Sequence, residues 1–334
     1  MHKKRESNID LLRFVGLSLI ILAHVSPPQT LLNIRCFDVP LMVFISGLTC
    51  YGKQINFTWK FVGHRFARLV FPVWIFLTIY FSFIFIAKSI GVNIELTTRQ
   101  VFESYLLLEG IGFVWIIRVF LLIALLTPFL TLINAKIKSS FTFIALFCAM
   151  LTLYLVLTFN SVGYNVGIIR DWLYYAIGYS FIFLLGLRIK DLKIVAKGCL
   201  FVLMTIIFIA LYAMDIKHLH NTTSVILHIN DWKYPPSNLF LVYGIIMSVA
   251  TYSLVYIVKR NKLNPFVRFV GCNSIWIYLW HIPLVHITAK LDMVWWFRYI
   301  IVYLSAVIIY NIQLYAVKTI KSKKDIGFLK YLQG

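Results

Sequence analysis

An apolar stretch near the N-terminus contains ionisable side chains at a spacing that could support proton transfer within a membrane. It covers residues 9–25 and includes Asp10 and Arg13 near its start and His24 near its end. Because eleven positions separate Arg13 from His24, an α-helix would place both side chains on nearly one face, roughly 16 Å apart along its axis. A charged group inside a bilayer costs several kcal/mol and therefore indicates function. The alternative is a helix whose polar ends reach the two membrane surfaces.

A carboxylate follows this stretch at a distance that favours contact with His24. Asp38 lies at the start of the next apolar segment, after a short loop, and two helices joined by a short loop are antiparallel neighbours. A carboxylate beside an imidazole fixes the tautomer of the ring and raises its basicity. We therefore expect Asp38 to orient His24 as a catalytic general base. The alternative is that Asp38 caps the helix before Pro40.

Two arginines after the second apolar segment could bind a phosphate. Arg65 and Arg68 are three positions apart, so they share one face of a helix at the membrane surface. Two guanidinium groups in this arrangement can hold a phosphate through paired donors. Ordinary anchoring at a basic membrane surface is the alternative, because other loops of the chain are also rich in Lys and Arg.

Several more side chains are candidates for lining the same site. Arg118 lies about one helical turn inside a later apolar segment, where it could neutralise an acid of the preceding loop or hold an acceptor. His281 lies beside Pro283, and it either lines the site or bonds to a carbonyl freed by the kink. Tyr175 belongs to an aromatic group that suits a membrane interface and could stack on a sugar ring. The remaining candidates are Asp10, Ser46 and Trp115.

No spacing of His, Cys, Asp or Glu is typical of a metal site. His218 and His220 lie two positions apart, but no further ligand follows at a regular spacing. The 5 cysteines are scattered along the sequence, and we expect them to pack among apolar side chains. We therefore predict neither a metal site nor a disulfide framework.

The composition is that of an integral membrane protein. Hydrophobic residues make up 61% of the 334 positions and charged residues only 13%, whereas about a quarter of a soluble domain is charged. The sequence therefore predicts an all-α polytopic membrane protein whose residues 1–334 form one integral-membrane domain. Runs of about 20 apolar residues predict about ten helical spans, near residues 9–25, 37–52, 69–88, 113–134, 141–159, 171–189, 197–215, 238–258, 274–290 and 294–317.

The Lys and Arg residues that give the net charge of +20 are distributed along the chain as the topology of a membrane protein requires. With the N-terminus inside, most of the Lys and Arg residues fall in segments on the inner side, as the positive-inside rule requires. This distribution predicts that both termini are cytoplasmic and that the lipid bilayer is the partner of the basic surface. It argues against nucleic-acid binding.

In this order along one chain, the motifs resemble those of the acyltransferase-3 family, the multi-span membrane O-acyltransferases that modify bacterial surface polysaccharides and related acceptors. The resemblance covers nearly the whole chain. It rests on Arg13, ten intervening residues and His24, then on residues 44–47 and the Arg65-x-x-Arg68 pair, and more weakly on residues 175–179 and 278–283.

The resemblance implies acyl transfer, usually of an acetyl group from acetyl-CoA, which is a co-substrate and not a bound cofactor. It also implies functional roles for Arg13 and His24, with Arg65 and Arg68 on the donor side, and a location in the bacterial inner membrane. The expected acceptor is a polysaccharide or lipid-linked glycan. His24 as a covalent acyl carrier, a longer acyl group, and a transporter of glycan or solute stay open as alternatives, as does the oligomeric state.

Overall fold

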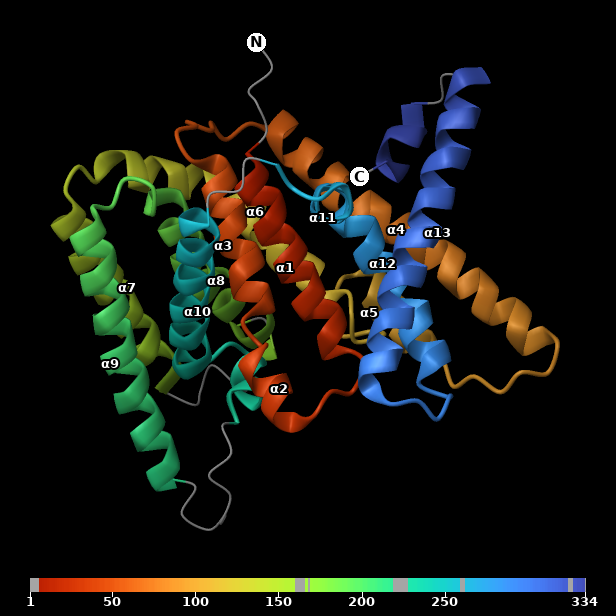
Figure 1. The fold of residues 1–334 in the computed structure, drawn as a ribbon, viewed down its shortest axis with the longest axis horizontal. Coiled ribbons are helices and arrows are strands. Elements are labelled where there is room, and N and C mark those ends of the chain that lie inside the picture. Colours follow the sequence, from red (N-terminus) through yellow and green to blue (C-terminus); the bar gives the residue numbers. More distant parts are fainter. Residues whose placement is uncertain are drawn as a thin grey trace.

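The computed structural model describes residues 6–159, 166–167, 169–218, 228–258, 262–323 and 327–333, and every regular element within these ranges is helical (Figure 1). The all-α prediction is therefore confirmed. The α-helices are α1 (Ser7–Ala23), α2 (Gln29–Ile34), α3 (Asp38–Cys50), α4 (Trp59–Ser89), α5 (Thr98–Tyr105), α6 (Trp115–Lys136), α7 (Ser140–Phe159), α8 (Tyr174–Arg188), α9 (Ile194–His218), α10 (Asn238–Ile257), α11 (Pro265–Cys272), α12 (Ser274–Thr288) and α13 (Trp295–Lys323). Shorter helical turns are η2 (Ile169–Leu173), η3 (Ile229–Lys233) and η4 (Gly327–Leu332).

Each predicted span coincides with one of these helices. Among the described residues, 7 helical segments are long and apolar enough to cross a membrane: α2 with α3, α4, α6, α7, α9, α10 and α13. The other predicted spans correspond to α1, α8 and α12, which have 17, 15 and 15 residues. The polytopic membrane class is confirmed, whereas the count of ten spans and the cytoplasmic termini stay predictions. We call the bundle end that holds Ser7 the inner end and the opposite end the outer end, following that predicted topology.

The centre of the bundle is formed by α1, α3, α8 and α10. Helix α1 runs through the middle, with α3 on one side and α12 and α13 on the other (Figure 1). The span that contains α3 is 72% buried inside the protein, whereas the span of α9 at the edge is only 11% buried. Helix α9 is therefore a lipid-facing element, and the polar side chains of α1 and α3 lie inside the protein.

Glycines let α3 and α8 approach backbone to backbone. A Cβ atom on Gly47 would overlap the carbonyl oxygen of Phe183, and one on Gly186 would overlap the carbonyl oxygen of Phe44. Small residues at such crossings allow close van der Waals packing, which is the main force between helices in lipid. The α3–α8 contact therefore tolerates no side chain at either glycine.

We predict that Gly47→Ala destabilises the protein by about 1–3 kcal/mol, because overpacking forces the two helices apart. Gly63 of α4 is the matched control, since no atom lies within 4 Å of a Cβ built there. Gly63→Ala should be neutral or stabilise slightly, because alanine has the higher helix propensity. Thermal unfolding of the purified protein in detergent measures both effects, and equal melting temperatures for the two variants would contradict the packing argument.

Candidate functional site

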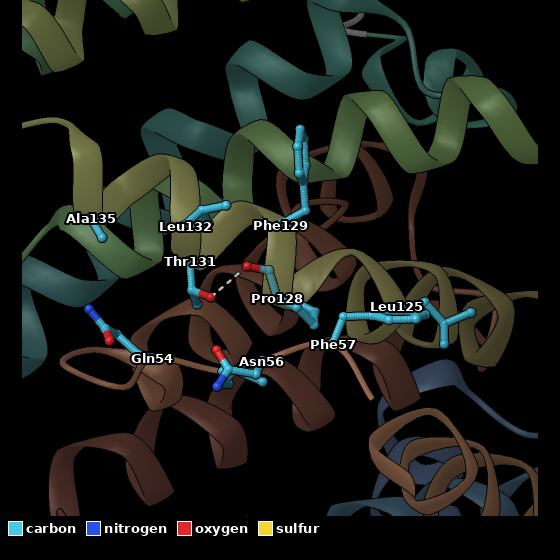
Figure 2. Close-up of a pocket in the computed structure, with 10 residues that line it drawn as sticks. Gln54, Asn56, Phe57, Leu125, Pro128, Phe129, Thr131, Leu132 and Ala135 are labelled. Carbon is cyan, nitrogen blue, oxygen red and sulfur yellow. Dashed lines mark hydrogen bonds between the residues drawn. The ribbon is translucent and has the colours of Figure 1, made fainter. Parts of the chain in front are cut away.

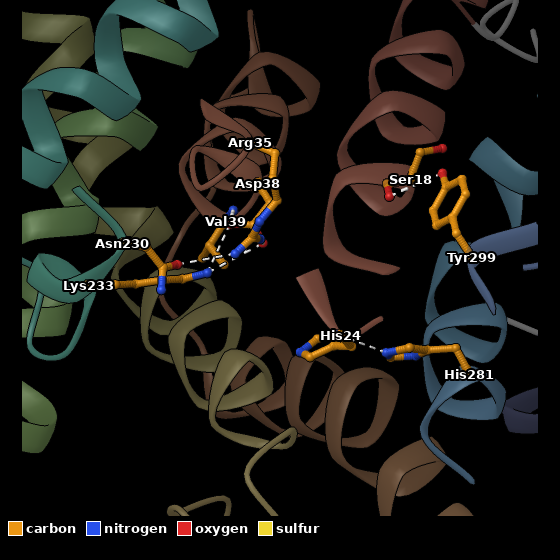
Figure 3. A network of polar contacts seen from close by, with 9 residues as sticks. All are labelled: Ser18, His24, Arg35, Asp38, Val39, Asn230, Lys233, His281 and Tyr299. Carbon is orange, nitrogen blue, oxygen red and sulfur yellow. Dashed lines mark hydrogen bonds and ion pairs between the residues drawn. The ribbon is translucent and has the colours of Figure 1, made fainter. Parts of the chain in front are cut away.

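His24 and His281 form a pair at the outer end of α1. His24 is the C-cap of α1, and His281 lies in α12. The Nδ1 atom of His24 is 3.1 Å from the Nε2 atom of His281, although the two residues are 257 positions apart (Figure 3). His281 is fully buried, whereas His24 is partly exposed. The structure thus joins a predicted catalytic residue to a residue that the sequence suggested only as a lining candidate.

The contacts of His281 indicate which nitrogen of His24 donates to it. The Nδ1 atom of His281 contacts the carbonyl oxygen of Tyr278, and a carbonyl can only accept, so this nitrogen donates. In the neutral ring Nε2 is then the acceptor, and Nδ1 of His24 must donate to it. In a neutral His24 ring the lone pair would then lie on Nε2, which is the arrangement that a general base requires.

An aromatic side chain covers this pair. The ring of Phe113 lies 4.7 Å from the ring of His24 and 5.9 Å from that of His281, measured between centroids. The hydroxyl of Tyr278 donates to the carbonyl oxygen of Phe113 over 2.5 Å. Tyr278 therefore fixes both the covering ring, through its hydroxyl, and His281, through its carbonyl.

Asp38 does not contact His24. Its carboxylate accepts hydrogen bonds from Arg35 Nη1 at 2.6 Å, Lys233 Nζ at 3.0 Å and the backbone N–H of Val39 at 2.8 Å (Figure 3). All three charged side chains are buried. The predicted Asp38–His24 pair is therefore not formed, because two cations from neighbouring segments compete successfully for the carboxylate.

The Asp38 network joins three segments of the outer end. Arg35 also donates to Asn230 at 3.2 Å, which lies with Lys233 in η3. Burial lowers the pKa of the Lys233 ammonium, and the Asp38 carboxylate opposes that shift. The charge pairs therefore hold η3 against the start of α3, and neutralisation of Asp38 would leave two buried cations without a counter-ion.

We predict that Asp38→Asn lowers the free energy of unfolding by about 3–5 kcal/mol, the usual cost of breaking a buried ion pair. Glu103→Gln is the control, since Glu103 pairs at 2.6 Å with Arg99, whose side chain is 86% exposed. Exposed pairs contribute about 0–1 kcal/mol. Thermal unfolding and the yield of monodisperse protein measure the difference, and an Asp38→Asn variant as stable as the wild type would refute the structural role.

The inner end holds the other predicted residues of α1 and α4. Arg13 lies 3.6 Å from the buried Asp10, and Cys272 of α11 donates to Asp10 over 3.6 Å. Asp10 therefore belongs to the contact between α1 and α11. Arg65 lies over the ring of Phe61 at 5.1 Å, and Arg68 is exposed.

Neither arginine of α4 forms an ion pair with a carboxylate in the described part of the chain. Arg65 and Arg68 are consequently available to an anion from outside the protein. Whether they bind a donor phosphate stays a prediction.

Three of the six lining candidates meet in one place, whereas Ser46 lies apart from them. The Trp115 and Tyr175 ring centroids are 6.0 Å apart, and the Arg118 guanidinium lies 5.4 Å from the Tyr175 centroid. Ser46, by contrast, donates to the Met42 carbonyl of its own helix at 3.0 Å. The Trp115, Arg118 and Tyr175 side chains therefore form a cluster at the outer end.

Sequence reasoning missed the roles of Tyr278, Phe113 and Lys233. Tyr278 precedes His281 by three positions, so a helical reading of that segment could have found it. No sequence pattern indicated the roles of Lys233 and Phe113, because their partners belong to distant segments of the chain. These contacts depend on tertiary packing alone.

A pocket of about 440 Å³ lies elsewhere, between the loop after α3 and the C-terminal half of α6 (Figure 2). Its walls are formed by Gln54, Ile55, Asn56, Phe57, Leu125, Pro128, Phe129, Thr131, Leu132 and Ala135. None of the predicted site residues lines it. Among the residues that the structure describes, no three His, Cys, Asp or Glu side chains gather as a metal site would require, and His220 lies outside them.

Comparison with known proteins gives one match. A family model described as an acyltransferase domain matches residues 6–310. No curated protein and no solved structure matches the chain. The matched range includes α1 with His24, the two arginines of α4, and α12 with His281.

Proposed function

The chain belongs to the acyltransferase-3 family, and from this premise we propose that it transfers an acetyl group from cytoplasmic acetyl-CoA to a hydroxyl group of a cell-surface polysaccharide or lipid-linked glycan. Family membership supports acyl transfer by a protein with membrane-spanning helices. The observation that supports the chemistry is the contact between Nδ1 of His24 and Nε2 of His281, in which a neutral His24 would carry its proton on Nδ1. The proposed location is the bacterial inner membrane.

In the proposed reaction, His24 is the general base. Its Nε2 atom takes the proton of the acceptor hydroxyl as the oxygen attacks the carbonyl carbon of the thioester. The carbon–sulfur bond then breaks, and the sulfur of CoA leaves with the proton that His24 held. The products are an acetyl ester and free CoA, and general base catalysis of this kind contributes roughly 10²–10⁴ in rate.

His281 would act in this scheme as a positioning residue. While His24 is protonated, its Nδ1–H points at the Nε2 acceptor of His281, and a hydrogen bond from a charged donor is stronger than one from a neutral donor. His281 thus stabilises the charged state of His24 without contacting the substrate. This is the role that the sequence assigned to Asp38.

The donor would be held at the inner end. Arg13, Arg65 and Arg68 are near the inner ends of α1 and α4, where the phosphates of cytoplasmic acetyl-CoA would arrive. Guanidinium groups bind phosphate oxygens through paired donors. The pantetheine arm would then extend along α1 towards His24, roughly 16 Å further along the helix axis.

We predict that His24→Ala lowers acetyl transfer by roughly 10²–10⁴-fold, because the proton acceptor is lost. His281→Gln should retain more activity than His281→Ala, since an amide oxygen can still accept from His24 Nδ1. Mass spectrometry of surface glycans and release of CoA by the purified protein measure transfer, and melting temperatures show that the variants are folded. Full activity of folded His24→Ala would end the proposal.

A separate prediction concerns the binding of the donor by the two arginines of α4. Arg65→Ala combined with Arg68→Ala should raise the KM for acetyl-CoA about tenfold or more, because hydrogen bonds to charged groups contribute about 1.5–3 kcal/mol each. The KM for the acceptor should not change. Arg99→Ala, in the exposed helix α5, is the control for loss of surface charge. A KM for acetyl-CoA unchanged in the double variant would show that the donor binds elsewhere.

A further inference from the structure

Arg118 is buried and has no polar partner among the residues that the structure describes. Its exposed fraction is 3%, and its guanidinium forms no hydrogen bond or ion pair within the described ranges, with Nε fully enclosed. The guanidinium lies over two aromatic rings instead, 5.5 Å from the Trp172 centroid and 5.4 Å from the Tyr175 centroid. Cation–π contacts offset only part of the cost of burying a charge without a counter-ion. The arrangement therefore lacks an anion.

The acids nearest to Arg118 do not supply this anion. Asp171 and Glu109 act on it electrostatically but form no ion pair with it. Asp171 is engaged by Arg170, which donates to both of its carboxylate oxygens at 2.8 and 3.1 Å. The five N–H donors of the Arg118 guanidinium lie in the plane of the group, and none of them donates a hydrogen bond to a residue that the structure describes.

Aromatic rings continue from Arg118 to a second cation. The Trp115 centroid lies 6.0 Å from that of Tyr175 and 4.8 Å from that of Tyr234. Lys233 Nζ lies 5.6 Å from the Trp115 centroid. We call Trp115, Trp172, Tyr175 and Tyr234 the outer aromatic cluster.

Two rings of the outer aromatic cluster are accessible, since Trp172 is 37% and Tyr234 54% exposed. The same region has an excess of buried positive charge, because Arg35, Lys233 and Arg118 are all buried there, whereas Asp38 is the one buried carboxylate among the described residues of that end. The faces of aromatic rings can stack on sugar rings, and the cations can form ion pairs with an acidic substituent of the sugar.

We propose that Arg118 binds an anionic group of the glycan acceptor, a carboxylate or a phosphate, while the outer aromatic cluster stacks on the sugar that bears it. The proposal rests on the proposed function for the identity of the ligand as an acceptor. The guanidinium fork matches the geometry of both anions. Phe113, which contacts the His24 ring, lies just before α6 and precedes Arg118 by five positions, so the segment that leads into α6 connects the anion site to the catalytic pair.

Binding of three related sugars to the purified protein in detergent, without acetyl-CoA, tests this proposal. Galacturonic acid, galactose 1-phosphate and galactose differ in the anionic group. A ligand that binds the native state raises the melting temperature, so at least one anionic sugar should raise it and galactose should not. A shift with galacturonic acid identifies a carboxylate site, and one with galactose 1-phosphate identifies a phosphate site. No shift with either anion, or an equal shift with galactose, would overturn the proposal.

Variants of the arginine show whether the anion binds there. Arg118→Gln should weaken binding of the anionic sugar about 10- to 100-fold, which corresponds to one charged hydrogen-bonded contact. Arg298→Gln, in the first turn of α13, should leave the shift unchanged. If Arg118→Gln does not fold, Arg118→Lys provides the same test, because it keeps the charge but loses the planar fork. Wild-type affinity in the variant tested would refute the assignment.

His24→Ala separates this proposal from the catalytic one. The variant should bind the anionic sugar as the wild type does while it fails to release CoA. If His24→Ala keeps full transfer activity, the proposed mechanism fails and the anion site stands. If Arg118→Gln binds the anionic sugar normally, the anion site fails and the role of His24 is untouched.

Discussion

The buried carboxylate of Asp38 determines how the outer end is arranged. By accepting from Arg35 and Lys233, it fixes η3 against the start of α3 and neutralises part of a strongly cationic region. The same pairing keeps the carboxylate away from His24, so the imidazole depends on His281 instead. The ion-pair network of Asp38 thus determines which side chain becomes the partner of the proposed base.

Hydropathy predicted the helices well because it is a local property. A bilayer requires long apolar helices wherever they occur in the chain, and all the predicted spans lie on helices of the structure. The family-specific residues of α1 and α4 were also recognisable from order and spacing. The partner of His24 was not, since the competition between Asp38 and His281 is decided by Lys233, which lies 195 positions from Asp38.

The polar groups divide between the two ends of the bundle. Arg65 and Arg68, which pair with no carboxylate in the described part of the chain, lie near the inner end of α4. The outer aromatic cluster with Arg118 lies at the other end. The His24–His281 pair lies at the outer end of α1, next to Phe113. In the proposed function this division separates a phosphorylated donor from a glycan acceptor, and only the acyl group has to cross most of the distance between them.

Consecutive helices hold both ends of α1. Near its inner end the backbone of Asp10 packs directly on Gly271 of α11, and at its outer end His24 contacts α12. Because α11 and α12 are adjacent in the chain, a displacement of α1 relative to this pair would break contacts at both of its ends. A rocking or sliding motion of α1, such as alternating access would use, is therefore restrained. In the proposed function, the flexible arm of the thioester donor and not a moving helix would span the distance between the two membrane faces.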